Sequence, residues 1–279
     1  MNTSQFESKV KQTLKQMKLS KKERIVIALS GGKDSAVTAY LLKKYGYNIE
    51  AFHINLEIGK YSEECLLKVR KLCELLEIKL HLYDMKKEFG SGMCYLRSVV
   101  QEKNKLKKGL KLKNCAICGV IKKWIFNKKA RELHASKIAT GHNLDDEAET
   151  FLMNIMKGSL QLSANIGIET RNVHDKKFVS RIKPLFFVSN NEIRKYALKM
   201  KIPFHPQPCP CRTDSYRIQI RNFVEKLSDK EKLNLMDNFF KLQEKLERNK
   251  KEKGSIRYCE ICGEPSRNEI CKMCELVKG

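Results

Sequence analysis

The sequence predicts an α/β fold: a doubly wound parallel sheet, then a helical carboxyl-terminal part and a small cysteine-bearing ribbon. Short apolar runs alternate with amphipathic helical stretches through the first half of the chain, and this alternation is typical of strands joined by crossover helices. From Ser189 onward the apolar spacing is helical only. Two C-x₂-C pairs then close the chain at the spacing of a small metal ribbon.

The expected elements follow from this alternation in chain order. The apolar run Arg24–Leu29 ends at a serine and two glycines, and helical spacing follows over Asp34–Tyr45, which gives a strand, a glycine loop and a helix. The same spacing predicts further strands over Ile49–Leu56, Lys79–Asp84 and Ser136–Thr140, and helices over Ser62–Leu76, Leu144–Met156, Asn190–Met200, Ser215–Leu227 and Asp229–Lys250. A helical insertion separates the third strand from the fourth.

The charge balance favours an acidic polymer as the partner. Lys and Arg number 56 against 32 Asp and Glu, a formal charge of +24, which exceeds what solubility requires. Six lysines gather in the insertion directly before Cys115, and they form either a solvated helix face or a contact to nucleic-acid phosphates. They are Lys103, Lys105, Lys107, Lys108, Lys111 and Lys113.

A cytoplasmic location is expected, with no membrane contact. Residues 1–22 are basic but hold no apolar stretch of signal-peptide length, and nothing later approaches the roughly 20 apolar residues of a membrane span. Thiols stay reduced in the cytosol, so the eleven cysteines are considered as metal ligands before disulfides.

The glycine loop predicts an anion-binding site. It lies where a strand meets a helix amino terminus, so free backbone amides and the positive end of the helix dipole face the bound anion. Its spelling is neither the mononucleotide P-loop nor the dinucleotide G-x-G-x-x-G, which argues against a GTPase and a dehydrogenase. Its six residues are Ser30, Gly31, Gly32, Lys33, Asp34 and Ser35.

This six-residue string resembles the PP-loop of ATP pyrophosphatases, which split ATP into AMP and pyrophosphate while attaching AMP to a substrate oxygen. The resemblance implies the PP-loop, adenine nucleotide alpha hydrolase-like fold and a nucleotide site. A second stretch, Gly141–Asp146 (GHNLDD), supports it, because in this family such a stretch closes over the nucleotide and helps to hold Mg²⁺. Asp145 and Asp146 are adjacent acids that suit Mg²⁺; the alternative is that they merely cap the following helix.

His53 and Asn55 end the second predicted strand, where this family places adenine and ribose. The sequence fixes the strand but not the face that points at the nucleotide, so either residue could equally face solvent.

Three further cysteines sharpen the resemblance. Cys115 and Cys118 form a C-x₂-C-G pair at the start of an expected helix, and Cys209 follows far downstream in Pro208–Cys211 (PCPC). With Cys115–Glu132 and the C-P then S-aromatic-R pattern that ends at Arg217, the chain resembles the TtcA/TtuA group of tRNA 2-thiolation enzymes.

The resemblance to that group implies a [4Fe-4S] cluster on Cys115, Cys118 and Cys209, with one iron left open for an exogenous sulfide. Cys211 departs from the pattern and is an alternative third ligand, a fourth ligand or a persulfide relay. Lys122 lies one helical turn past Cys118, at a position where the group carries a functional basic residue; the alternative is an ordinary solvated lysine.

The last four cysteines predict a structural zinc site by spacing alone. Four thiolates leave zinc no open position, so the expected role is structural, and the basic residues around it could touch RNA phosphates. The ligands are Cys259, Cys262, Cys271 and Cys274. No cysteine precedes Cys65, so the resemblance implies a relative without the amino-terminal zinc finger that members of the group usually carry.

The resemblance implies an ATP-dependent tRNA sulfurtransferase that adenylates a pyrimidine C2 oxygen and then inserts sulfur. Sulfide or a ubiquitin-like sulfur-carrier protein is the expected donor, tRNA the substrate, and a homodimer the expected assembly. Another PP-loop tRNA-modifying enzyme that attaches an amine, like lysidine synthetase, and a non-catalytic zinc-ribbon RNA binder are the alternatives. The expected domains are an amino-terminal helical segment (1–22), a PP-loop catalytic domain (23–205), a helical region with the third cluster cysteine (206–254) and the zinc ribbon (255–279).

Overall fold

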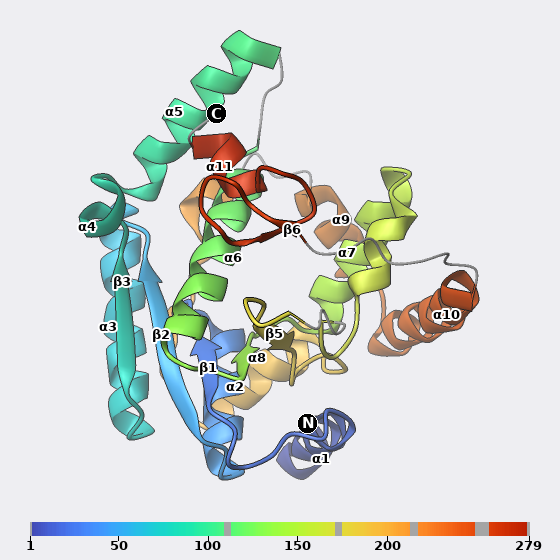
Figure 1. The fold of residues 1–279 in the computed structure, drawn as a ribbon. Helices are drawn as coiled ribbons and strands as arrows, with labels where there is room; N and C mark the ends of the chain where they lie inside the picture. The colour runs from blue at the N-terminus through green and yellow to red at the C-terminus, as the bar shows by residue number, and fades with distance from the viewer. Residues whose placement is uncertain (1, 109–112, 171–174, 213–216, 249–256, 278–279) are drawn as a thin grey trace.

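The computed structural model describes residues 2–108, 113–170, 175–212, 217–248 and 257–277. Its centre is a five-stranded sheet of order β3-β2-β1-β4-β5 (Figure 1), in which every pairing is parallel. The strands are β1 (Ile25–Ala28), β2 (Ile49–Asn55), β3 (Leu80–Asp84), β4 (Lys137–Ala139) and β5 (Ser180–Ile182).

Two separate hydrophobic cores cover the two faces of the sheet because apolar residues point alternately to each side. Ile25 and Ile27 of β1 join the core on one face, whereas Val26 joins the core on the other. The first face carries α1 (Thr3–Gln16), α2 (Lys33–Lys44), α3 (Gly59–Leu75) and α8 (Asn190–Lys199), and the second carries α4 (Met85–Phe89), α5 (Met93–Lys108) and α6 (Asn114–Glu132).

A third core lies beyond β4 and belongs to the helical part of the chain. Phe151 and Leu144 pack there against Phe239, in the group of aromatic rings that joins α7 to the last long helix. The elements are α7 (Leu144–Met156), the 3₁₀ turns η1 (Leu160–Asn165) and η2 (Pro210–Arg212), α9 (Arg217–Val224) and α10 (Asp229–Arg248). The ribbon closes the chain with β6 (Arg257–Tyr258), β7 (Pro265–Ser266) and α11 (Lys272–Val277).

The predicted α/β class is confirmed, and so are the four predicted strands. A fifth strand, β5, was not among the predicted strands. β5 has only three residues and two of them are polar, so it lacks the apolar run that marks the others. The predicted helix over Ser215–Leu227 is described from Arg217 to Val224; Ser215 and Tyr216, with Lys111 of the lysine stretch, lie outside the described residues.

The sheet order places a topological switch point between β1 and β4. From β1 the chain crosses to β2 on one side, whereas β4 lies on the other side of β1. Ligands of open parallel sheets bind at the carboxyl ends of the strands at such a point. No helix in the described part of the chain combines the length and apolarity that crossing a bilayer requires.

Candidate active site

The glycine loop after β1 is folded by its own serines. The hydroxyls of Ser30 and Ser35 lie 3.1 Å apart, and Ser35 Oγ donates to the carbonyl of Gly32 at 3.0 Å. Gly31 has φ +86°, and a Cβ there would come within 2.8 Å of Cys65 Cβ, so only glycine fits. Gly32 caps α2 without a side-chain hydrogen bond, which leaves the first helical amides available to an anion.

The second predicted motif lies directly against this loop, as the parallel pairing of β1 with β4 requires. A Cβ on Gly141 would lie 2.5 Å from the backbone nitrogen of Ser35, so the two loops approach as closely as backbones can. Asn143 Nδ2 donates to Asp34 Oδ1 at 3.2 Å. The two motifs therefore form one site rather than two.

Two carboxylates meet at this contact. Asp146 closes a capping box with Asn143 at the start of α7, and its side chain stays 24% exposed. Burial raises the pKa of Asp34, Lys33 opposes that rise, and the negative charge of Asp146 adds to it. Neighbouring acids that repel one another suit a divalent cation. The capping alternative for Asp146 is thus realised. Its other carboxylate oxygen, Oδ1, lies 3.7 Å from Arg217 Nη2 and 3.9 Å from Arg221 Nη2.

Asp145, although adjacent, points into the protein. Lys232 Nζ of α10 lies 2.7 Å from Asp145 Oδ1, and the backbone nitrogen of Asn190 donates to Asp145 Oδ2 at 2.8 Å. Both side chains of the ion pair are buried. Asp145 therefore fastens α7 to α8 and α10, and its predicted nucleotide contact stays a prediction that this geometry does not favour.

Replacing Lys232 with Met should cost about 3–5 kcal/mol of unfolding free energy, because it leaves Asp145 buried and unpaired. Chemical denaturation measures this loss. Lys230→Met, at an exposed position on the same helix, removes the same charge and should change stability by less than about 0.5 kcal/mol. Equal effects of the two substitutions would remove the buried pair from the account.

Around Asp146 lies a group of cations that the sequence analysis did not single out. The buried carboxylate of Glu149 binds the guanidinium groups of Arg217 and Arg221, the latter at 2.8 Å. Glu147, also buried, binds Lys183 at 2.8 Å. The signal was present in the sequence as the acids that follow one another from Asp145 to Glu149, but their partners come from three separate segments.

The positive charge near Asp146 also suits an anionic ligand. Burial and the charges of Arg181, Lys183 and Arg217 lower the pKa of Lys123. Loss of hydration and the charges of the same cations lower the pKa of His142. The imidazole is therefore neutral at physiological pH. Such a convergence favours a polyanion such as a triphosphate or a nucleic-acid backbone.

Three other residues predicted for the site, His53, Asn55 and Lys122, lie in different surroundings. His53 is 3% exposed; its Nδ1 lies 2.8 Å from the carbonyl of Leu29 at the end of β1, so Nδ1 donates and Nε2 is a buried acceptor with no partner among the described residues. That orphaned acceptor fits a ribose hydroxyl or an adenine amino group. Asn55 instead accepts from the backbone of Glu57 at 3.2 Å, in a local turn. Lys122 lies half-buried on α6.

The cysteines predicted for a cluster converge from distant parts of the chain. Cys115 and Cys118 lie in the first turn of α6, and the turn η2 packs against this helix. Burial raises the pKa of Cys209, and the nearby thiols of Cys211 and Cys118 add to that rise. Cys115 is exposed and the other three are half-buried, as expected for thiols that line an accessible site.

The segment that leads to Cys209 is tied to the glycine loop. The backbone nitrogen of His205 donates to the carbonyl of Gly31 at 2.7 Å. His205 Nε2 lies 2.8 Å from a carboxylate oxygen of Glu64 on α3, and its ring contacts Tyr61 at 5.1 Å. The segment that leads to Cys209 therefore contacts the glycine loop, so the thiol site and the loop do not lie on opposite faces of the molecule.

The ribbon cysteines form a tighter group. Their four sulfur atoms all lie within 4.8 Å of one another, and among the described residues no other group of three or more metal-ligating side chains is this close. This spacing fits a single tetrahedral zinc ion. The sulfurs of a four-iron cluster bind different irons and are spaced more widely, so the cluster cysteines need not meet this limit. Backbone N–H donors outweigh burial and lower the pKa of Cys259 to about 6.

This ribbon is fixed to the helix that carries the cysteine pair. The buried Glu264 accepts hydrogen bonds from Arg131 and from Asn127 Nδ2, the latter at 3.0 Å. Met273 and Cys274 share a hydrophobic core with Ile121 of α6. The ribbon therefore packs against α6 and stabilises its position.

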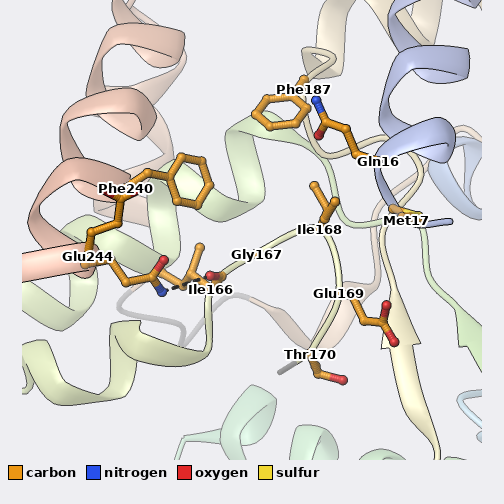
Figure 2. Close-up of a pocket in the computed structure, with 11 residues that line it drawn as sticks. Gln16, Met17, Ile166, Gly167, Ile168, Glu169, Thr170, Phe187, Phe240 and Glu244 are labelled. Atoms are coloured by element: carbon orange, nitrogen blue, oxygen red, sulfur yellow. Dashed lines mark hydrogen bonds between the residues drawn. The ribbon is translucent and has the colours of Figure 1, made fainter. Parts of the chain in front are cut away.

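A cavity of about 530 Å³ lies apart from these groups (Figure 2). Phe187 and Phe240 contribute much of its apolar lining, beside Ile166 and Ile168. None of the residues predicted for the nucleotide, the cluster or the zinc lines it.

Comparison with known proteins places this geometry in context. A family described as the PP-loop domain matches residues 2–227. The tRNA-5-methyluridine(54) 2-sulfurtransferase of Pyrococcus horikoshii is 37% identical over 97% of this chain and 84% of its own length. The cytoplasmic tRNA 2-thiolation protein 1 of Laccaria bicolor is 31% identical over 98% of this chain and 77% of its own.

A solved structure is also similar over nearly the whole chain. It is the U34-tRNA thiolase NcsA from Methanococcus maripaludis with its [4Fe-4S] cluster, at a TM-score of 0.79 and 29% identity. The match covers 99% of this chain and 87% of that one.

Proposed function

Since this chain belongs to the PP-loop family of tRNA 2-thiolation enzymes, we propose that it uses ATP to replace the C2 oxygen of a tRNA pyrimidine with sulfur. One observation carries the proposal: His205 joins the segment that ends at Cys209 to the carbonyl of Gly31 in the nucleotide loop. The thiols and the phosphate loop can then act on the same base.

The first step activates the base oxygen. A C2 carbonyl oxygen is a poor leaving group because it would have to depart as oxide. Attack of this oxygen on the α-phosphorus of ATP releases pyrophosphate, and AMP then becomes the group that departs when sulfur attacks C2. The amides after Gly32 bind phosphate oxygens, and the cations near Asp146 neutralise the charge that develops, so catalysis is mainly positioning and charge stabilisation.

The nucleotide and its cation are assigned to named residues. The glycine loop Ser30–Ser35 and Gly141 hold the phosphates, and the orphaned Nε2 of His53 supports an assignment to the nucleoside. Asp146 with Asp34 would hold Mg²⁺, which prefers a carboxylate or two together with phosphate oxygens. We assign Lys122, one turn past Cys118, to the developing phosphate charge.

Cys115, Cys118 and Cys209 would hold the [4Fe-4S] cluster, which supplies an iron without a protein ligand where sulfide can bind. Cys211, two residues further along the chain, stays the alternative to Cys209. The four ribbon thiols would hold a structural zinc ion. The domain division at residues 22, 205 and 254 stays a prediction.

The partners follow from charge and from the relatives. A formal charge of +24 suits tRNA, whose phosphates attract basic surfaces. Sulfide or a ubiquitin-like carrier protein is proposed as the sulfur donor, and a homodimer as the assembly. We infer a cytoplasmic location from the relatives called cytoplasmic tRNA thiolation proteins.

Mass spectrometry of tRNA nucleosides tests the proposal. Unmodified tRNA is incubated anaerobically with the iron-loaded protein, ATP, Mg²⁺ and sulfide, and a pyrimidine 16 mass units heavier should appear only when all components are present (an oxygen exchanged for sulfur, roughly +16). An amine adduct would instead support the lysidine-synthetase-like alternative. Tight tRNA binding without any modified nucleoside would support the RNA-binding alternative.

A further inference from the structure

Among the residues that the structure describes, the buried Arg97 beside the cluster cysteines hydrogen-bonds to sulfur alone. Arg97 of α5 is 6% exposed, and its Nη2 lies 3.0 Å from Cys94 Sγ and 3.0 Å from Cys211 Sγ. Its Nε is buried and has no hydrogen-bond partner among the described residues. Across that part of the chain no carboxylate pairs with it.

Such a cation requires a compensating negative charge. Burying an unpaired guanidinium is costly, and proteins ordinarily pair it with a carboxylate. Here the groups that face it are two sulfurs from segments more than 100 residues apart in the chain. The orphaned Nε adds a donor for an additional anionic atom. This environment suits an anionic sulfur species.

Cys94 and Cys211 also lie beside the cysteines that are proposed to hold the cluster. Cys211 lies two residues past Cys209 in the chain, and Asn114, next to Cys115, donates to the carbonyl of Cys211 at 3.4 Å. Cys94 is exposed, so a sulfur donor in solution can reach the pair. The thiols therefore connect the surface to the cluster cysteines.

We propose that Cys94 and Cys211, held by Arg97, form a dithiol that accepts a sulfane sulfur from a persulfide donor and releases it as sulfide beside the cluster cysteines. This inference rests on the proposed thiolation activity and names the source of its sulfur. It assigns Cys94, an otherwise unexplained exposed thiol, to sulfur delivery, and Arg97 to positioning.

The chemistry balances in three steps. Cys211 thiolate attacks the outer sulfur of a persulfide RS–SH, forming Cys211–S–SH and expelling RS⁻. Cys94 thiolate then attacks Cys211 Sγ, which forms the Cys94–Cys211 disulfide and expels HS⁻. The dithiol loses two electrons and the sulfane sulfur gains them. A reducing protein dithiol of the thioredoxin class restores both thiols.

The test uses the full-length, iron-loaded protein under anaerobic conditions, with one equivalent of glutathione persulfide as the probe. Peptide mass spectrometry should find the Cys94–Cys211 disulfide, with about one sulfide released per protein. In Cys94→Ser the persulfide should instead remain on Cys211, and sulfide release should fall roughly tenfold. Cys73→Ser, a buried thiol outside the pair, should behave like the wild type.

A second readout separates this inference from the proposed function. When free sulfide replaces the persulfide, Cys94→Ser should thiolate tRNA within about twofold of the wild-type rate, because the relay is bypassed. Loss of thiolation with free sulfide in the wild type would sink the proposed function itself. Unchanged sulfide release in Cys94→Ser, or loss of iron from Cys211→Ser, would overturn the relay.

Discussion

Replacing Cys115 and Cys118 together with Ala should abolish tRNA thiolation and remove the iron from the protein. A cluster of four irons held by three thiolates does not survive the loss of two of them. Thiolation should fall by on the order of 10³-fold or more, the scale seen when an essential reacting group is removed. Iron analysis, the brown absorbance and nucleoside mass spectrometry measure these losses on the same preparation.

The matched control for this pair is Cys73→Ala, which removes a thiol of α3 that is buried in the core. It should keep its iron and its activity. Zinc content should stay constant in both variants, because neither substitution changes the ribbon cysteines that would hold the zinc. Full thiolation by the double variant without iron would show that the cluster is not required for sulfur transfer.

Asp146→Asn should stop the formation of AMP while leaving both metal centres in place. The substitution keeps the shape of the side chain and an oxygen that can cap α7, but it removes the charge that would hold Mg²⁺. ATP-to-AMP turnover in the presence of tRNA should fall roughly 10²–10³-fold. Unfolding free energy should change by no more than about 1 kcal/mol.

Asp237→Asn makes the same chemical change at an exposed position on α10 and should leave turnover intact. The two variants together separate the loss of a metal ligand from the loss of one negative charge on a basic protein. Wild-type turnover by Asp146→Asn would exclude that carboxylate from the reaction, and the cation would then have to be assigned to Asp34.

Much of the fold was predictable because its signals are local. A short apolar run followed by a helical stretch marks β1, and the repeats of this pattern located β2, β3 and β4. The family followed from the loop at Ser30 and the motif at Gly141, and the match to the PP-loop domain confirms it. β5 escaped because three residues, two of them polar, carry too little pattern to distinguish a strand from a turn.

The site was predictable as a list of residues but not as a set of contacts. Spacing identified Asp145 and Asp146 as a pair, yet only tertiary structure shows that one is buried against Lys232 while the other stays partly exposed. Arg97 and Cys94 carried no motif at all, because their meaning depends on a contact with Cys211 over 100 residues away. Long-range pairing of this kind leaves no periodic trace in a single sequence.

The central claim is that the nucleotide loop and the cluster thiols act on one base in one reaction. A single-turnover experiment with α-labelled ATP, limiting tRNA and excess sulfide tests it most directly, by counting AMP and thiolated nucleoside in the same sample. The account predicts one AMP for each thiolated base, with neither product formed by Asp146→Asn. Thiolated tRNA that accumulates without a matching amount of AMP would contradict it.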